Sequence, residues 1–291
     1  MVNAAWVALS VQQHIGAKTL QALLTRFGSA QAVLAADEAS LRQVPGIGPK
    51  IAATIQQINL EAFRRALDTW QRAGVRIIPW DDPLYPHQLQ ILNDPPPVLF
   101  IRGQWPLPAH ITAGRLPVGI VGTRQPSPAA HDAAYDLGAQ LAANGHAVVS
   151  GLAYGIDAAA HHGALSTTGG ITLAVLGSGV LRPYPAAHHA LAEQIMTHGA
   201  LIAECAPDAN ANAPRLVARN RLIAGLVGAL FVMETDENGG AMYAARWATD
   251  CGTAVYTLDL PATGNQRLIA EGAQPLKLAE IGTFNLPSAG P

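Results

Sequence analysis

Ser150-Gly-Leu-Ala-Tyr-Gly-Ile-Asp-Ala-Ala-Ala-His-His-Gly-Ala-Leu165 is the stretch that decides the fold of this chain. It follows the short apolar run His146-Ala-Val-Val149, which predicts a buried strand, and it ends in an alanine-rich segment that predicts a helix. Gly151 and Gly155 allow the backbone between them to approach a ligand closely, because glycine has no Cβ and accepts positive φ. A helix N-terminus also presents unpaired N–H groups and the positive end of a dipole. The stretch therefore predicts an anion-binding turn.

The same arrangement occurs twice more in the chain. Val118-Gly-Ile-Val121 predicts a strand, Gly122-Thr123-Arg124 a turn, and residues 128–144 an apolar-periodic helix. Ile171-Thr-Leu-Ala-Val-Leu176 predicts a further strand, followed by the turn Gly177-Ser178-Gly179. In an open parallel sheet, ligands bind outside the carboxyl ends of the strands. We therefore expect these glycine turns to line one surface, which is the candidate site.

Short apolar runs alternate with helical patterns from residue 118 to about 273, as expected of a parallel sheet covered by helices on both faces. The fold class predicted is α/β, an extended Rossmann-like, doubly wound and mostly parallel sheet. Strands are expected near residues 118–121, 146–150, 171–176, 200–203, 229–233 and 254–258. No element is predicted after about residue 274, and residues 287–291 are expected to be frayed.

Residues 1–73 predict short helices that form a small all-helical domain of the helix-hairpin-helix, SAM-like type. Pro45-Gly-Ile-Gly-Pro49 predicts the hairpin, and Lys50 opens the second helix. Such glycines expose backbone N–H groups to a nucleic-acid phosphate, and Lys50 adds a charge-assisted contact. His14-Ile-Gly-Ala-Lys18 is a weaker copy of the same pattern. A hairpin that only packs on its neighbour and binds nothing explains the pattern equally well.

The chain is predicted to divide into four segments. They are the helical domain at 1–73, a connector with accessory strands at 74–117, the Rossmann-like domain at 118–280 and a tail at 281–291. Within the connector, Val75-Arg-Ile-Ile-Pro79 and Val98-Leu-Phe-Ile101 predict strands, and residues 102–117 predict a surface loop.

Composition narrows the class of protein. The chain has 291 residues, of which 49% are hydrophobic and only 13% charged, so it is globular rather than disordered. Its net charge of −2 gives no general attraction for nucleic acid, so any such contact must depend on local arginines. No apolar run is long enough to suggest a membrane helix, and no signal peptide is evident, so a cytoplasmic protein without membrane contact is expected. Cys205 and Cys251 fit no metal-binding spacing.

Arginines and glycine turns carry the candidate chemistry. No G-x-G-x-x-G fingerprint follows the first strand of the large domain, and no G-x-x-x-x-G-K-[ST] loop is present. Arg124 instead lies at a helix entry, where its fork suits a phosphate. Arg219-Asn220-Arg221 begins another apolar helical pattern, and Asn238-Gly239-Gly240 predicts an anion nest. Phosphate contact is the favoured interpretation of the arginines, and the alternative is a structural ion pair with Asp157, Glu204 or Glu234.

A hydrolase is a weaker hypothesis. Ser150, Asp157 and His161 are the residue types of a catalytic triad, with Asp157 and His161 one helical turn apart. The same two residues are equally explained by a contact within a helix, so we expect no catalysis.

These motifs together resemble the DNA-processing protein A family, also called DprA or Smf, over roughly residues 10–275. The matching blocks are Val121-Gly-Thr-Arg124, Ser150-Gly-Leu-Ala153 with Gly155-Ile-Asp157, Gly177-Ser-Gly179 with Tyr184-Pro185, Arg219-Asn-Arg-Leu-Ile-Ala-Gly-Leu226, and Asn93-Asp-Pro-Pro96 in the connector.

The resemblance implies a protein that binds single-stranded DNA without cutting it and hands it to a RecA-type recombinase in natural transformation or recombination. It implies a homodimer formed through the Rossmann-like domain, and it brings no catalytic residue, metal or cofactor. The residues expected to contact DNA are Gly122, Thr123, Arg124, Ser150, Gly151, Gly177, Ser178, Arg219, Asn220, Arg221, Asn238, Gly239 and Gly240, with Lys50 in the hairpin.

The sequence departs from the family pattern at two places that bear on DNA binding. Asn238-Gly-Gly-Ala-Met242 replaces a usual Lys-Ser-Gly-Ser-Leu, and Leu216-Val217 replaces a usual phenylalanine and proline. With that lysine missing, we expect the arginines to carry more of the phosphate contact. The alternative function is a nucleotide-binding or nucleotide-hydrolysing relative similar to phosphoribohydrolases, whose Pro-Gly-Gly-x-Gly-Thr motif this chain lacks.

Overall fold

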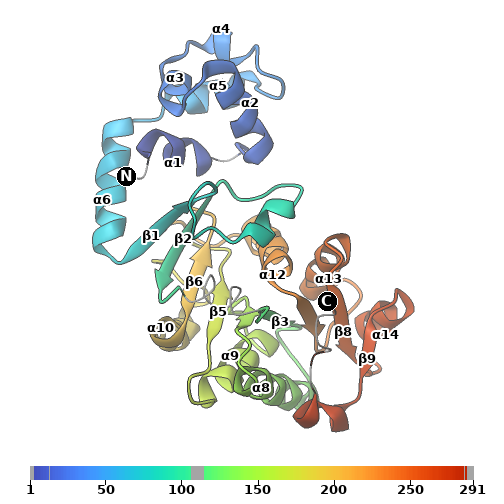
Figure 1. The fold of residues 1–291 in the computed structure, drawn as a ribbon. Helices are drawn as coiled ribbons and strands as arrows, with labels where there is room; N and C mark the ends of the chain where they lie inside the picture. Colours follow the sequence, from blue (N-terminus) through green and yellow to red (C-terminus); the bar gives the residue numbers. More distant parts are fainter. Residues whose placement is uncertain (1–2, 13, 106–114, 285, 287–291) are drawn as a thin grey trace.

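The computed structural model describes residues 3–12, 14–105, 115–284 and 286. Within them one nine-stranded sheet runs in the order β1-β2-β6-β5-β4-β3-β7-β8-β9 (Figure 1). The neighbours from β6 to β9 are parallel, whereas β1 and β2 pair antiparallel at one edge. The strands are β1 Val75–Pro79, β2 Val98–Gly103, β3 Val118–Val121, β4 Val148–Ser150, β5 Thr172–Val175, β6 Ala200–Ala203, β7 Ala229–Val232, β8 Ala254–Leu258 and β9 Gln274–Leu276.

Helices cover both faces of the sheet. Helices α8, α9 and α10 pack on one face, and α12 and α13 pack on the other (Figure 1). The helices of this part are η1 His87–Ile91, α8 Pro128–Ala143, α9 Ile156–Ser166, η2 Ala186–His188, α10 His189–His198, α11 Ala213–Ala218, α12 Asn220–Leu226, α13 Gly240–Asp250, α14 Thr263–Ala270 and η3 Leu278–Thr283. The predicted fold class is confirmed: a mostly parallel, doubly wound sheet follows an all-helical segment.

The strand order places a topological switch point between β3 and β7. From β3 the chain moves outward through β4, β5 and β6, and then returns to the other side of β3 to form β7, β8 and β9. The helical connections that leave β3 and β7 therefore depart toward opposite faces, which opens a crevice at the carboxyl ends of these two strands. This geometry makes the crevice the candidate ligand site before any side chain is considered.

The alanines and glycines of α8 and α9 allow these two helices to pack with their backbones close together. A Cβ on Gly163 would lie 2.0 Å from the carbonyl oxygen of Tyr135, and one on Gly138 would lie 2.5 Å from that of Ala160. Both distances are too short for a carbon atom, so a larger residue at either position would push the helices apart. The alanine-rich stretch after β4 is thus a packing surface.

The N-terminal helices have a small core of their own. They are α1 Ala4–Ser10, α2 Ala17–Phe27, α3 Ala30–Ala35, α4 Glu38–Leu41, α5 Pro49–Gln56 and α6 Leu60–Arg72. Leu20, Leu23 and Leu41 are fully buried in that core. The Trp6 ring meets the Trp80 ring edge-on at 5.1 Å between centroids, and Trp70 meets Phe100 of β2 at 5.8 Å. These ring contacts join the helical segment to the antiparallel edge of the sheet.

Most predicted strands agree with the structure to within two residues at each end, but the prediction of no element after residue 274 is wrong. Strand β9 pairs parallel with β8, and η3 follows it. Phe284 then packs against Phe231 at 5.3 Å between ring centroids. A three-residue strand containing Pro275 is too short to show a periodic pattern, so only its pairing with β8 reveals it.

The predicted accessory strands of the connector, β1 and β2, are the antiparallel edge of the main sheet. The predicted surface loop at 102–117 and the predicted frayed end at 287–291 lie largely or wholly outside the described residues. The four-segment domain division stays a prediction.

Replacing Gly163 by alanine should destabilise the protein. Alanine favours a helix over glycine by roughly 0.5–1 kcal/mol, but overpacking typically costs about 1–3 kcal/mol, so the steric cost outweighs the gain. Urea unfolding should show a lower midpoint with little change in the slope of unfolding free energy against urea. Gly240→Ala is the matched control, because a Cβ there meets nothing within 4 Å. Equal stability of the Gly163→Ala and wild-type proteins would contradict the backbone contact between α8 and α9.

Candidate nucleic-acid interface

A cavity of about 300 Å³ occupies the crevice at the switch point. It lies between the turn after β3, the turn after β7 and the start of α12. Its lining includes the predicted site residues Gly122, Thr123, Arg124, Arg219, Asn220, Gly239 and Gly240, together with Asp157, Leu216, Val217, Thr235 and Asp236. The turns after β3 and β7 therefore come together, whereas the sequence led us to expect the glycine turns after β3, β4 and β5 to line one surface.

Arg124 is the exposed cation of this cavity. Glu234, which follows β7, holds the turn that carries Arg124 through two hydrogen bonds. The carbonyl oxygen of Glu234 accepts from the Thr123 N–H at 2.7 Å, and its carboxylate accepts from the Ser127 N–H at 2.6 Å. Glu234 therefore holds the entry of α8 and does not pair with Arg124. Among the described residues no ion-pair partner of Arg124 is found, so its guanidinium is available to an anion.

The N-terminus of α13 adds backbone donors to the same cavity. Gly239 is its N-cap residue and supplies no side-chain hydrogen bond to the first turn. The opening N–H groups of a helix have no partner within the helix and favour an anion. The Asn220 side chain donates to the carbonyl oxygen of Gly240 at 3.1 Å, which fixes α13 against α12. Asn238 is exposed in the turn before the helix. Asp236, also in the lining, is exposed and opposes an anion here, whereas the carboxylate of Asp157 in the same lining is paired with Arg219.

Arg219 is a buried structural cation. Its side chain is 8% exposed and pairs with Asp157, which is 4% exposed, at 3.4 Å between Nη2 and Oδ2. It also donates to the carbonyl oxygen of Val175 at 2.8 Å. Burial, opposed by Asp157 and reinforced by the nearby charge of Arg124, lowers the pKa of Arg219. The ion pair considered as the alternative for this arginine is therefore present in the structure.

The turn after β4 is occupied by this ion pair. The N–H groups of Gly151 and Ala153 donate to the Asp157 carboxylate at 3.1 and 3.3 Å. A Cβ on Gly151 would lie 1.3 Å from Arg219 Nη1, so glycine makes room here for the arginine. The anion in this predicted anion-binding turn is thus the protein's own Asp157.

Four predicted contact residues are covered in this conformation. Ser150 and Ser178 are 0% and 1% exposed. Ser150 donates its hydroxyl to the carbonyl oxygen of Ile120 at 2.6 Å. A Cβ on Gly177 would lie 2.7 Å from the backbone of Leu216, because α11 packs over this turn. Ser150, Gly151, Gly177 and Ser178 are therefore buried in this conformation, and their contact with DNA stays a prediction. Helix α11 covers Gly177, whereas the Arg219 guanidinium fills the space beside Gly151.

Arg221 points away from the cavity. Its guanidinium binds the Glu204 carboxylate at 2.5 and 2.8 Å and lies 3.8 Å from Asp94. Burial disfavours the charge, but Glu204 and Asp94 more than offset it and raise the pKa of Arg221. Arg221 therefore links α12 to the connector. Its guanidinium is buried and paired in this conformation, so it is not accessible for the predicted contact with DNA.

The two hairpins of the helical segment differ. Gly46 has a φ of 84° in the turn between α4 and α5, and Lys50 is exposed at the start of α5. These helices lie at the end of the helical segment farthest from the sheet (Figure 1). In the weaker copy, at residues 14–18, the Ala17 N–H donates to the Asp94 carboxylate at 3.4 Å, and a Cβ on Gly16 would meet that carboxylate at 2.9 Å. The anion at the hairpin of residues 14–18 is therefore Asp94 of the protein itself, whereas Lys50 in the other hairpin is exposed.

Ser150, Asp157 and His161 do not form a triad. Ser150 donates to Ile120, Asp157 pairs with Arg219, and the Nδ1 of His161 bonds the Thr172 hydroxyl at 2.7 Å. The Thr172 hydroxyl itself donates to the carbonyl oxygen of Val148, so it accepts from His161. Burial, with smaller contributions from neighbouring histidines and Arg219, lowers the pKa of His161 to about 3.

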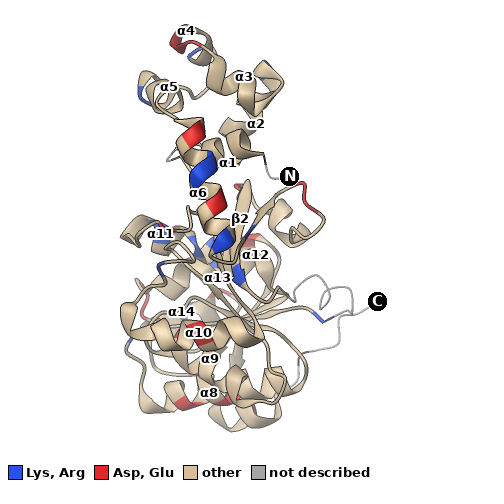
Figure 2. Ribbon diagram, turned by 90° about the vertical axis from the view of Figure 1, so that its left-hand side faces the viewer, with Lys and Arg blue, Asp and Glu red and all other residues tan. Residues whose placement is uncertain are grey.

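Charges elsewhere are sparse. Figure 2 shows a ribbon that is mostly tan, the colour of uncharged residues, with short blue and red segments that alternate along α6.

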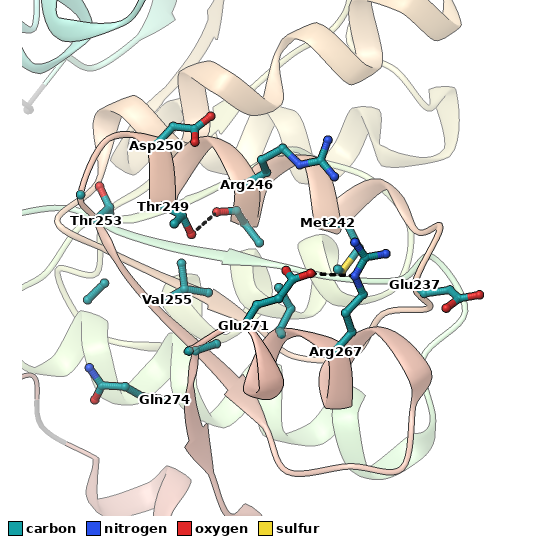
Figure 3. Close-up of a pocket in the computed structure, with 16 residues that line it drawn as sticks. Glu237, Met242, Arg246, Thr249, Asp250, Thr253, Val255, Arg267, Glu271 and Gln274 are labelled. Carbon is teal, nitrogen blue, oxygen red and sulfur yellow. Dashed lines mark hydrogen bonds and ion pairs between the residues drawn. The ribbon is translucent and has the colours of Figure 1, made fainter.

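A larger cavity of about 430 Å³ lies between α13 and α14 (Figure 3). Its Arg267 is paired with Glu271 at 2.8 Å, and Glu237 and Asp250 also line it, so anionic side chains outnumber arginines. In the described ranges there is no cluster of three or more metal-ligating side chains, and no helix there could span a membrane.

Sequence reasoning missed the supports of the site. The sequence suggests Glu234 only as an ion-pair partner, and Asp94 only as part of the Asn93-Asp-Pro-Pro96 block, so neither is predicted to support the site. The cover formed by α11 is not predicted either.

Comparison with known proteins identifies the family. A model of the DNA recombination-mediator protein A family matches residues 76–283, and a SAM-like tandem helix-hairpin-helix matches residues 9–57. The chain is 34% identical over 301 residues to "Protein Smf" of Synechocystis, which covers 99% of this chain and 75% of that protein. It is 32% identical over 228 residues to "DNA processing protein DprA" of Bacillus subtilis, covering 77% of this chain and 75% of that protein.

Solved structures agree in fold. The DNA processing protein A of Streptococcus pneumoniae superposes with a TM-score of 0.78 at 24% identity, over 98% of this chain and 99% of that one. The Helicobacter pylori protein, whose structure is described by its "unique single-stranded DNA binding mode", has a TM-score of 0.61 at 28% identity, over 68% of this chain and 92% of that one. The fold is thus that of a Rossmann-type protein, and the family model and the relatives place it among DNA-processing proteins. The chain belongs to the DNA recombination-mediator protein A family, which includes DprA and Smf.

Arg219 is buried and paired whereas Arg124 is exposed, and this difference can be measured through the stability of variants. Asp157→Asn removes the partner of a buried cation and should lower the free energy of unfolding by about 3–5 kcal/mol. Arg124→Ala removes an exposed cation and should change it by less than about 0.5 kcal/mol. Urea titrations of the two variants and the wild type measure these changes in the free energy of unfolding. An Asp157→Asn protein as stable as wild type would show that the ion pair does not hold the turn.

His161 should make stability depend on pH. Its folded-state pKa of about 3 lies below the usual value of 6.5, so the unfolded chain binds this proton first as the pH falls. Its contribution is complete above about pH 6.5 and is lost progressively toward pH 3. On lowering the pH from 7.5 to 5.5, the wild type should lose about 1.4 kcal/mol more unfolding free energy than His161→Gln. If the unfolding free energies of the wild type and His161→Gln change with pH in parallel, His161 is not buried in its neutral form.

Proposed function

We propose that this protein binds single-stranded DNA in the crevice between β3 and β7. The observation that carries the proposal is an unpaired, exposed Arg124 beside the uncapped N-terminus of α13 at the topological switch point. A guanidinium fork and adjacent backbone N–H groups are complementary to successive phosphates. Family membership supports DNA as the ligand, and the name of the Helicobacter pylori structure supports a single strand.

The predicted site residues take different roles under this proposal. Gly122, Thr123, Arg124, Asn238, Gly239 and Gly240 contact phosphates directly, and Asn220 orients the start of α13. Arg219 and Arg221 hold the surrounding turns through Asp157 and Glu204. Lys50, at the far end of the helical segment, is a secondary contact for a longer strand.

The family relationship supports a wider role. We propose that the protein protects incoming strands and passes them to a RecA-type recombinase in natural transformation or recombination, as a cytoplasmic homodimer formed through the Rossmann-like part. We propose binding without catalysis and without a cofactor, because Ser150, Asp157 and His161 are each engaged in separate internal bonds.

Arg124→Ala should weaken binding to a single-stranded oligonucleotide by about 1–3 kcal/mol, the range for a lost charge-assisted contact. It should also reduce the slope of log affinity against log salt by about 0.7, since one phosphate contact is lost. Arg124→Lys should restore part of the affinity, because an ammonium keeps the charge but lacks the fork. Fluorescence anisotropy at several salt concentrations measures all three quantities.

The matched control is Arg246→Ala, which removes an exposed arginine from the cavity between α13 and α14. It should leave both affinity and salt slope unchanged. An Arg124→Ala protein that is folded and binds with wild-type affinity and slope would exclude the crevice as the DNA site.

A further inference from the structure

An aromatic surface lies beside the crevice, on the side of β4 and β5. Tyr154, in the turn after β4, is 46% exposed. His188, at the end of η2 in the connection after β5, meets the Tyr154 ring at 4.8 Å between centroids with an interplanar angle of 67°. An exposed tyrosine held edge-on against an imidazole offers a flat apolar face to solvent.

The surface is held rigidly from both sides. On one side the Nδ1 of His188 bonds the carbonyl oxygen of Leu152 at 2.8 Å, and Leu152 is fully buried. On the other side Gly155 has a φ of 72°, and a Cβ there would lie 2.5 Å from the carbonyl oxygen of Thr123. The Ile156 N–H also donates to that Thr123 carbonyl at 3.2 Å. The turn that carries Tyr154 is therefore fixed directly against the turn that carries Arg124.

The aromatic surface is continuous with the crevice. Ala153, next to Tyr154, already lines the cavity together with Arg124. In the sheet β5, β4, β3 and β7 are consecutive neighbours, so the connections that carry His188, Tyr154, Arg124 and Gly239 leave the sheet side by side. Three interstrand spacings span about 14 Å. Stacked nucleotides rise by about 3.4 Å each, so this edge is long enough for about four of them.

We propose that Tyr154, supported by His188, is a base-stacking platform for the single strand whose phosphates occupy the crevice. This inference rests on the function proposed above and names how the bases, as distinct from the phosphates, are bound. Base–aromatic stacking tolerates any sequence, because every base has a π-face. It also supplies affinity that a chain with a net charge of −2 cannot obtain from a basic surface.

The test compares two ligands that have the same number of phosphates: a fluorescent oligothymidylate and an abasic oligomer of equal length. Tyr154→Ala should weaken oligothymidylate binding about fivefold to a hundredfold, the range for one base–aromatic stack. It should leave binding of the abasic oligomer and the salt slope unchanged, since no phosphate contact is lost. Tyr154→Phe keeps the ring and should bind like the wild type.

Two further variants make the test specific. Tyr135→Ala removes a tyrosine of α8 that is 37% exposed and has no part in the aromatic surface, and it should bind both oligomers like the wild type. His188→Asn retains a side-chain donor for the Leu152 carbonyl but removes the supporting ring, and it should show a smaller loss that is again confined to the oligothymidylate. Thermal unfolding confirms that each variant is folded.

The outcomes separate this inference from the proposed function. If Tyr154→Ala binds oligothymidylate like the wild type, or weakens both oligomers equally, the stacking platform is wrong. If the stacking platform fails in this way but Arg124→Ala still lowers affinity and salt slope, single-strand binding in the crevice stands. If the wild type binds neither oligomer, the proposed function fails together with the inference.

Discussion

The buried ion pair between Asp157 and Arg219 is the constraint on which the carboxyl edge of the sheet depends. Through it, the first turn of α9, the backbone turn after β4, the end of β5 and the start of α12 share one network of hydrogen bonds. A buried charge without its partner would be costly, so these elements must stay together. The network fills the edge above β4 and β5 and leaves the crevice open between β3 and β7.

This constraint changes what the arginines do. Arg219 and Arg221 neutralise internal carboxylates, so neither adds a free positive charge to the surface. Arg124 remains, with backbone N–H groups at the start of α13. Among the described residues that line the cavity, Arg124 is the one cation without a carboxylate partner. Such a site would bind a polyanion more weakly than a basic groove does, which would make the proposed stacking contact of Tyr154 more important. A chain with 13% charged residues thus has a physical reason to combine both kinds of contact.

Much of the fold could be predicted because short apolar runs, glycine turns and helical periodicity are local signals. The strands from β3 to β8 and the position of the glycine turns at the carboxyl edge of the sheet follow from them. The switch point between β3 and β7 and the exposure of Arg124 required the tertiary structure. Strand β9 could not be predicted from local signals, because three residues that include a proline show no period. That β1 and β2 join the edge of the main sheet is likewise seen only from the pairing of β2 with β6.

The sequence by itself determined the alternation of strands and helices, and with it the edge of the sheet at which we propose that a ligand binds. The tertiary structure alone decided which glycine turn stays open. Gly122 and Gly151 follow parallel strands in the same way, yet Gly151 accommodates a guanidinium that arrives from a residue 68 positions later, whereas Gly122 lines the open cavity. Long-range ion pairs have no local period, because the distance along the chain between Asp157 and Arg219 is set by topology and not by helix or strand geometry.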